Sequence, residues 1–377
     1  MNISSTCPNT PALSYICLLL KKKFFMLQRI FPAVLFIIVI AFLSACSTKF
    51  NIAAPYKNIT IVNGLMDMDD TAHYVRVEKA FLDQNQSALT MAQVADSSYY
   101  PQLQVIIKEI DVTNNNNIVN TITLNRVDMN AEGYQKQSGT FFTSPNYAYK
   151  FTNALNPNHS YRLVVKNPAT GEVDSAITSI IDTSQIQVPE FNNLSYTVSL
   201  FGTNPNQIFD LGGTLPDSAA MYEGIMRVHW LDSTNTGSVP QYADWNFVPI
   251  MAVQTPGTLD LSTACINFYY FLKNTMGAPG PGVRRYLQGV DIYIYAGNSA
   301  LYNYEQLSLY SGTGITGLES QPTYTNIAGK SVLGLFANRG YKADYNIDFD
   351  IPTKDSFFTN STIDSIVAGL NIVGFKH

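Results

Sequence analysis

The chain has 377 residues, with 23 lysine and arginine residues against 28 aspartate and glutamate residues, a formal net charge of −5. Charged residues make up only 14% of the chain and hydrophobic residues 46%, which excludes a disordered polyelectrolyte. The absence of a basic excess argues against a nucleic-acid partner. Tyrosine (23) and phenylalanine (21) are abundant, and we expect most of these side chains to lie in cores.

The amino-terminal segment predicts a lipoprotein signal peptide. Residues 30–43 form an unbroken apolar run that is too short for a membrane span, and Lys21, Lys22, Lys23 and Arg29 precede it. Residues 43–46 (LSAC) follow and resemble the bacterial lipobox, in which the cysteine becomes the lipidated amino terminus. The sequence therefore predicts a signal peptide over residues 1–45. A transmembrane anchor followed by an ordinary cysteine is the alternative.

Lipidation of Cys46 predicts a stable membrane anchor, because a diacylglycerol group and an amide-linked palmitate-like chain together bury three hydrocarbon chains. Residues 46–56 are the expected tether. Ser47, rather than aspartate, follows the cysteine, which by resemblance to the known sorting rule favours the outer membrane and leaves open which face. Residues 1–25 add nothing to the signal peptide, so we expect Met26 to be the true start.

Removal of residues 1–45 changes the charge and the cysteine inventory. The leader carries four basic and no acidic residues, so the remaining 332 residues hold 19 basic and 28 acidic side chains, a net charge of −9. With Cys46 lipidated, Cys265 has no partner thiol. A disulfide framework is therefore excluded, and stability must come from conventional hydrophobic cores.

Short alternating segments separated by Asn, Gly, Pro and Asp predict a mainly β fold. Four consecutive asparagines at 114–117 favour a hairpin turn, and 87–94 favours one or two helical turns. The strands expected in this part cover residues 58–65, 73–81, 102–110, 118–127, 162–165 and 173–180.

Leu155 and Tyr161 resemble the tyrosine corner of immunoglobulin-like and fibronectin-like sandwiches. In that motif the phenol ring packs on the core and its hydroxyl group bonds the backbone of the preceding turn. His159 lies in that turn, where we expect a local capping role. We therefore predict that residues 57–185 form an immunoglobulin/fibronectin-like β-sandwich domain.

Residues 186–377 are predicted to form a second β-rich domain with a few short helices, after a polar linker at 182–193. Gly334 lies in an apolar segment, 332–336, which suits a central strand near a close backbone approach. The expected strands are 194–201, 225–231, 290–295, 345–351 and 363–373, and the expected helices are 261–275 and 300–309.

Sequence motifs for catalysis and metal binding are lacking, so we predict no catalytic residue, no metal site and no cofactor. The carboxylates of residues 67–70 favour an acidic hairpin tip over a calcium site. Trp230 and Trp245 favour core packing over sugar stacking, and Cys265 favours an inert core thiol. The sequence does not exclude a pair of carboxylates for glycoside hydrolysis, because the distance between such residues is set by the fold and not by their spacing in the sequence.

The triplet Asp-(Ser/Thr)-(small or aliphatic) occurs more often than composition predicts. It resembles the O-glycosylation sequon that Bacteroidetes use on exported proteins, and the alternative is that Asp-Ser simply begins turns. The candidate acceptors are Thr71, Ser175, Ser218, Ser233 and Ser365.

Two regions of the chain resemble an uncharacterised family of Bacteroidetes outer-membrane lipoproteins that carry a domain of unknown function. They are residues 320–337, with Asn326-Ile327 followed by Gly334-Leu335-Phe336, and the segments 61–65 and 74–77. The chain departs from the family pattern at Leu333, where a glycine is usual. The resemblance implies an immunoglobulin-like front domain and a place among genes for TonB-dependent uptake, but no activity.

Together these patterns predict a non-enzymatic, lipid-anchored protein of the cell outer membrane. Its expected partners are the membrane, through the lipid anchor, and either a protein such as an outer-membrane transporter or a nutrient such as a glycan. A glycan-active hydrolase of the cell envelope is the alternative function, and a structural accessory of an uptake or secretion complex is a third.

Overall fold

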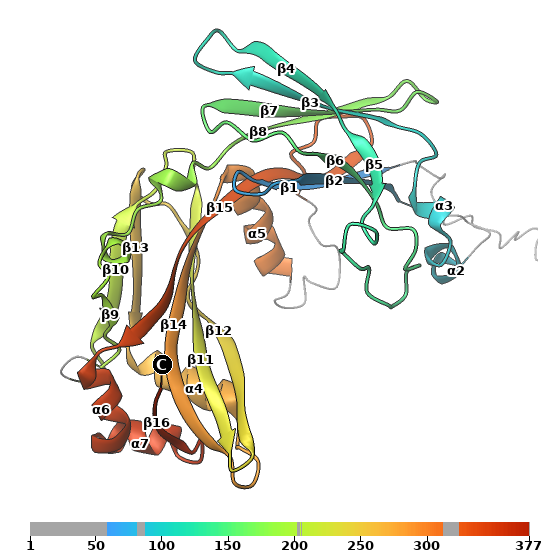
Figure 1. Cartoon of the computed structure of the whole chain (residues 1–377). Coiled ribbons are helices and arrows are strands. Elements are labelled where there is room, and N and C mark those ends of the chain that lie inside the picture. Colours follow the sequence, from blue (N-terminus) through green and yellow to red (C-terminus); the bar gives the residue numbers. More distant parts are fainter. Residues whose placement is uncertain (1–58, 81–86, 202–203, 205, 312–323, 377) are drawn as a thin grey trace, which may run out of the picture. The chain divides into compact units, whose positions relative to one another are not determined.

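The computed structural model describes residues 59–80, 87–201, 204, 206–311 and 324–376 (Figure 1). Strands dominate these residues, and the predicted mainly β fold with a few short helices is confirmed. None of the helices in the described ranges is both long and apolar enough to cross a membrane.

The front part of the chain forms a β-sandwich, as predicted. Its strands are β1 (Thr60–Asp67), β2 (His73–Lys79), β3 (Gln104–Asp111), β4 (Asn117–Thr123), β5 (Asn125–Asp128), β6 (Tyr147–Phe151), β7 (His159–Lys166) and β8 (Val173–Ser179). One sheet has the order β4-β3-β7-β8, and β1-β2-β6-β5 belong to a ten-stranded sheet. Inward side chains from both sheets, among them Val62, Ile107 and Leu163, form the front core.

Local sequence signals account for several of these elements. Asn115 and Asn116 have φ angles of 53° and 56° in the turn between β3 and β4, a conformation that asparagine tolerates. The helical turns expected near 87–94 appear as α2 (Ala88–Ala92) and, just beyond, α3 (Ala95–Ser98). The expected strand 118–127 divides at the buried Leu124, because β4 pairs with β3 whereas β5 pairs with β6.

The rear part contains long strands with helices beside them. Its elements are η1 (Thr183–Gln185), η2 (Pro189–Asn192), β9 (Thr197–Val198), β10 (Ile208–Thr214), β11 (Met221–Thr234), β12 (Gly237–Ala252), β13 (Thr258–Ala264), α4 (Ile266–Met276), β14 (Arg284–Gly297), α5 (Ser299–Ser311), β15 (Val332–Phe349), α6 (Ile351–Thr359), α7 (Ser361–Val367) and β16 (Ile372–Phe375). Strands β10 and β13 form a separate pair. Met226, Leu261 and Phe268 belong to the aromatic-rich rear core.

Several expected elements of this part are wrong in type or extent, and the expected strand 345–351 is the end of β15, which stops at Phe349 before α6. Residues 361–367 form helix α7 rather than the start of a strand, because Asn360 Oδ1 accepts hydrogen bonds from the Thr362 and Ile363 amides. Residues 258–264 pair with β10, so the expected helix 261–275 begins only at Ile266. The expected strand 194–201 is reduced to Thr197–Val198, which pairs with the end of β15.

Strand β15 belongs to both parts of the molecule (Figure 1). Its first half, Val332–Arg339, runs parallel to β1, and its second half runs antiparallel to β14. Gly334 has φ +127°, and a Cβ atom there would lie 1.8 Å from the Val62 carbonyl oxygen, which confirms the close backbone approach. The boundary between 57–185 and 186–377 stays a prediction.

The segment expected to be a linker, 182–193, also contributes to packing. Ile186 and Val188 are buried in the rear core. The backbone of Gln187 exchanges hydrogen bonds with Thr214, at 3.1 and 2.9 Å. This segment is therefore held on the rear core over much of its length.

Candidate functional site

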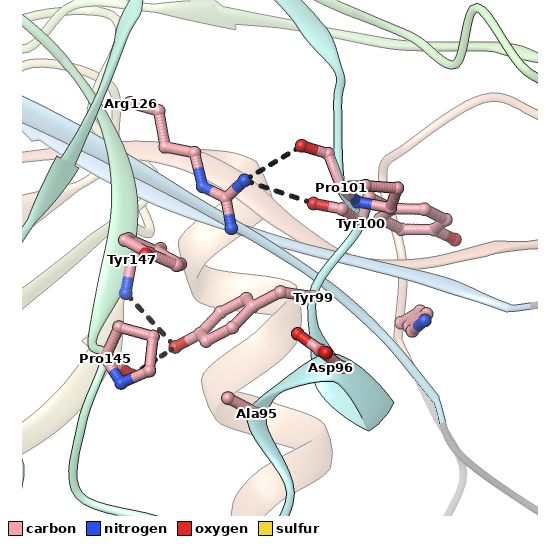
Figure 2. Close-up of a pocket in the computed structure, with 9 residues that line it drawn as sticks. Ala95, Asp96, Tyr99, Tyr100, Pro101, Arg126, Pro145 and Tyr147 are labelled. Atoms are coloured by element: carbon pink, nitrogen blue, oxygen red, sulfur yellow. Dashed lines mark hydrogen bonds between the residues drawn. The ribbon is translucent and has the colours of Figure 1, made fainter.

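A pocket of about 660 Å³ lies beside the front sandwich (Figure 2). Its strand residues come from one end of the sheet: Lys79 ends β2, Arg126 belongs to β5 and Tyr147 begins β6. Arg126 pairs across the strands with Tyr149, whose side chain is in the front core. Because cross-strand partners point to the same face, the pocket lies at the open end of the sandwich interior.

Tyr99 and Tyr100 form the wall that follows helix α3. The Tyr99 hydroxyl accepts a hydrogen bond from the Tyr147 amide at 3.2 Å and donates one to the Pro145 carbonyl at 3.4 Å. Its ring packs edge-on against Tyr147, with 5.2 Å between centroids. The Tyr100 hydroxyl lies 2.8 Å from Thr60 Oγ1. Both rings are buried, and burial raises the pKa of Tyr99, which keeps its hydroxyl group protonated at neutral pH.

Arg126 is the main polar group of the pocket. Its Nη1 donates hydrogen bonds to the carbonyl oxygens of Tyr100 and Pro101, at 3.2 and 3.1 Å (Figure 2). Its guanidinium group lies 3.8 Å from the centroid of the Tyr147 ring, a cation–π contact. Nε and Nη2 donate to no acceptor among the described residues, so two donor groups are available on a side chain held in place.

The other charged groups of the pocket are Lys79 and Asp96. Its described lining therefore offers two cations, one carboxylate and three tyrosine side chains. Fixed donors beside aromatic rings suit a small polar ligand with an apolar face, such as a sugar. The excess of cations favours a ligand that carries an anionic group.

The described residues hold no cluster that could bind a metal ion, and the described lining of the pocket holds no pair of carboxylates. No group of three His, Cys, Asp or Glu side chains gathers among the described residues with a geometry that could hold a metal ion. Asp67 is buried and accepts a hydrogen bond from the Asp69 amide at 3.2 Å, which agrees with the acidic hairpin tip between β1 and β2. In the pocket, Asp96 is the single carboxylate of the described lining.

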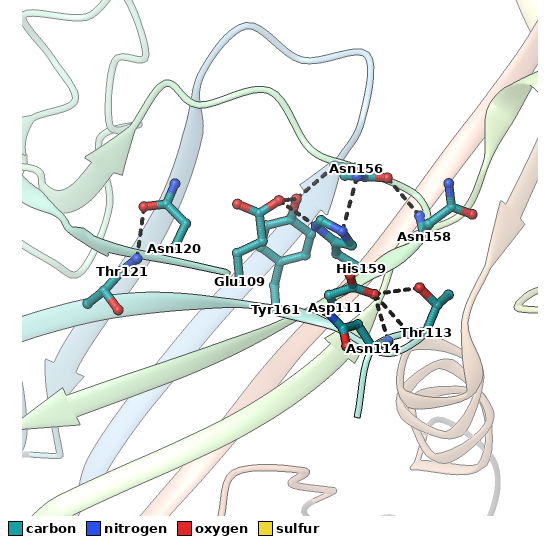
Figure 3. A network of polar contacts seen from close by, with 10 residues as sticks. All are labelled: Glu109, Asp111, Thr113, Asn114, Asn120, Thr121, Asn156, Asn158, His159 and Tyr161. Carbon is teal, nitrogen blue, oxygen red and sulfur yellow. Dashed lines mark hydrogen bonds and ion pairs between the residues drawn. The ribbon is translucent and has the colours of Figure 1, made fainter. Parts of the chain in front are cut away.

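The tyrosine corner is confirmed (Figure 3). The Tyr161 hydroxyl accepts a hydrogen bond from the Asn156 amide at 2.7 Å and donates one to Glu109 Oε1 at 3.1 Å. The Nδ1 atom of His159 lies 2.7 Å from the same carboxylate oxygen, so its shorter contact is with β3, and the local contact in the turn is between its Nε2 and Asn156 Nδ2 at 3.3 Å. Tyr161 is fully buried, and burial raises its pKa. This network joins β3 to β7 and is structural.

The predicted core roles of three residues are also confirmed. Trp230 and Trp245 are buried in the rear core, so neither ring is available for sugar stacking. Cys265 is fully buried, and burial raises its pKa to about 11, which leaves the thiol protonated at neutral pH. None of the three is a site residue.

The predicted modification sites are scattered rather than brought together. Cys46 lies outside the described residues. Thr71 is exposed in the β1–β2 turn and Ser365 is exposed on α7, where its hydroxyl donates to the Thr362 carbonyl. Three are half-buried: Ser175 in β8, Ser218, whose hydroxyl donates to the Ile180 carbonyl, and Ser233 in β11. Their glycosylation stays a prediction.

None of the pocket residues was singled out from the sequence. They come from β2, α3, β5 and β6, which are separated by loops whose paths no local pattern predicts. The available signal was the segment Tyr99-Tyr100-Pro101, two aromatic residues before a proline outside any alternating pattern.

Comparison with known proteins adds no identification. No protein-family model matches the chain, and no curated protein matches it. Among solved structures, the chain is similar to the C-terminal globular domain of an oligosaccharyltransferase from Pyrococcus abyssi, with 8% sequence identity and a TM-score of 0.18. That match covers 77% of this chain and 46% of the other. At this TM-score the likeness supports no statement about function.

Proposed function

We propose that this protein is a cell-envelope lipoprotein that binds a ligand without transforming it, and that the pocket beside the front sandwich takes a sugar with an anionic group. The observation that carries the proposal is the position of Arg126, stacked on Tyr147 with two unused donor groups directed to no described acceptor. A uronate carboxylate could accept hydrogen bonds from both Nε and Nη2 of Arg126, since guanidinium and carboxylate groups match in geometry.

The test is calorimetric titration of the full chain with an oligosaccharide that ends in glucuronate, against the same oligosaccharide ending in glucose. We expect the charged ligand to bind and Arg126→Ala to weaken its binding by about tenfold or more. Arg162→Ala is the matched control, because Arg162 is an exposed arginine in β7, away from the pocket lining. Equal binding by the two arginine variants would refute the pocket assignment.

Anchoring at the outer membrane is the second part of the proposal, and the lipobox-like sequence before Cys46 supports it. Cells expressing the chain should incorporate an alkyne fatty-acid probe into it, and Cys46→Ala should abolish the labelling. Labelling that survives in the variant would overturn the anchor. A glycan ligand and an outer-membrane position together fit a role beside an uptake transporter, which co-purification with the tagged lipoprotein would reveal.

A glycan-active hydrolase would need two carboxyl groups about 5 to 10 Å apart at the bound sugar. Asp96 stands as the single carboxylate of the described pocket lining, so the geometry favours binding over hydrolysis.

A further inference from the structure

Five tyrosines gather on one face of the long rear strands, far in sequence from the pocket residues. We call this surface the tyrosine face; it consists of Arg227, Tyr242, Tyr293, Tyr295, Tyr341 and Tyr345. The strand neighbours of these residues, such as Met226 and Ile294, point the other way and lie in the rear core. One face of the four strands β12, β11, β14 and β15 is therefore core, and the other carries the tyrosines.

Neighbouring side chains of the tyrosine face contact one another. Arg227 lies 4.5 Å from the ring centroid of Tyr242 and 5.4 Å from that of Tyr293. The rings of Tyr293 and Tyr295 are nearly parallel at 6.4 Å, and that of Tyr295 lies 5.5 Å from Tyr341. Four strands at a spacing of about 4.8 Å make this row about 14 Å wide.

The charged side chains beside these rings have polar partners; Glu223, opposite Tyr295 in β11, accepts a hydrogen bond from Asn246 Nδ2 at 2.6 Å. Arg227 donates two hydrogen bonds to Asp244, from Nε at 2.6 Å and from Nη2 at 2.9 Å. Next to it, His229 Nε2 lies 2.8 Å from Asp291 Oδ2. A charged partner would have to compete with these pairs, whereas an uncharged one would leave them intact.

Helix α5 covers part of the same sheet face and shows where the cover ends. Leu301 of α5 packs with Leu335 and Ala337 of β15 and with Met221 of β11. Past this cover Tyr242, Tyr341 and Tyr345 are exposed, with exposed fractions of 61%, 36% and 52%, whereas Tyr293 and Tyr295 are half-buried. Exposed aromatic rings of this number on one face indicate a binding surface.

We propose that the tyrosine face binds an uncharged glycan chain that lies across the four strands. Sugar rings present C–H faces that pack on aromatic rings, and their hydroxyl groups can bond the phenol, guanidinium and carboxylate groups of the face. A protein partner would use the same kinds of side chain, tyrosine and arginine, so the test below must show binding of a polysaccharide itself.

This site goes beyond the proposed pocket in position and in ligand. The pocket holds an excess of cations and the volume of a small ligand, whereas the tyrosine face is open and elongated, and its charged groups are already hydrogen-bonded. The two sites therefore predict different ligands: an anionic sugar terminus for the pocket and a neutral stretch of chain for the face.

The test is affinity electrophoresis of the full chain in detergent through gels containing laminarin, xyloglucan, galactomannan or dextran, with alginate as an anionic comparison. We expect at least one neutral polysaccharide to retard the protein, and the double variant Tyr293→Ala/Tyr341→Ala to weaken that binding by about tenfold or more. Tyr270→Ala is the matched control, since Tyr270 is an exposed tyrosine of helix α4 outside the face. If the double variant does not fold, as judged by its circular dichroism, Tyr242→Ala and Tyr345→Ala replace it.

Three results would overturn the inference: no retardation by any of the neutral polysaccharides, unchanged retardation of the tyrosine variants, or stronger binding of alginate that these variants abolish. Arg126→Ala separates the two sites. Loss of neutral binding in Arg126→Ala alone would assign that glycan to the pocket and refute the face. Loss in the tyrosine variants alone would support the face whatever the outcome for the pocket.

Discussion

The two halves of β15 belong to one strand but meet different surroundings. Val332–Arg339 runs parallel to β1, with Phe336 in the front core and Leu335 beneath α5, so this half is enclosed on both faces. From Arg339 onward the strand pairs with β14 and presents Tyr341 and Tyr345 outward. The first half of β15 is therefore interior, whereas the second half exposes side chains on one of its faces. Substitutions in the first half should therefore cost more stability.

The largest expected effect is that of Gly334→Ala. A Cβ atom at this position meets the Val62 backbone, and φ of +127° is strained for any residue with a side chain. We expect the free energy of unfolding to fall by about 5 kcal/mol, measured by urea denaturation of the full chain.

The control for Gly334→Ala is Gly212→Ala, a strand glycine in β10 around whose Cβ position nothing lies within 4 Å. Its stability should change by about 0.5 kcal/mol or less. Equal effects of the two substitutions would mean that the parallel pairing of β1 with β15 is not as tight as described.

Gly340→Ala tests the second half of β15 and should have an intermediate effect. The nearest atoms to its Cβ position are side-chain atoms, Thr183 Cγ2 at 2.6 Å and Ile181 Cγ2 at 3.1 Å. Side chains can rotate or shift where a backbone carbonyl cannot, so we expect a loss of about 2 kcal/mol in the same urea experiment. A loss of unfolding free energy as large as that of Gly334→Ala would contradict the expected difference between the two halves of β15.

The smallest expected effect concerns Asp67, which faces Arg339 at the point where the two halves of β15 meet. Burial raises the pKa of Asp67 above its ordinary value of 3.8. The folded state therefore holds this proton more tightly than the unfolded state. Stability is lost as pH rises from 3.8 through the raised pKa, and does not return above it.

Asp67→Asn removes this loss, since the amide is uncharged and its oxygen can still accept the hydrogen bond from the Asp69 amide. We expect the variant to be more stable than the unchanged protein at neutral pH, by less than the loss from Gly340→Ala. Thermal melts between about pH 3 and about pH 8 should show the difference growing with pH. Asp217→Asn, at an exposed position between β10 and β11, is the control. A difference that shrinks as pH rises would contradict the assignment.

Local sequence signals predicted the front part of the fold well, because its decisive interactions join residues close in sequence. The asparagine turn needs only residues that tolerate positive φ, and the tyrosine corner joins Tyr161 to the amide of Asn156, five residues away. Helix α7 was missed although its buried Ile363, Ile366 and Val367 follow helical spacing, since a short apolar stretch fits either period.

Composition could not tell which aromatic residues lie in cores. We expected the tyrosines to serve mainly as core residues, and Tyr161 and Tyr269 do, but the tyrosine face is partly open to solvent. In β14 the alternation of Ile292 and Ile294 with Tyr293 and Tyr295 shows that the two sets face opposite ways. It does not say whether a second layer covers the tyrosine side, because that depends on elements distant in sequence.

The sequence by itself determined the predominance of strands, the tyrosine corner, the buried tryptophans and thiol, and the close approach at Gly334. Only the tertiary structure decided that residues 332–339 pair with residues 60–67, that one strand serves both parts, and where the pocket and the tyrosine face form. The physical reason is the range of the interactions. Turn conformation and alternation act over a few residues, whereas parallel pairing and surface exposure depend on segments that folding brings together from distant parts of the chain.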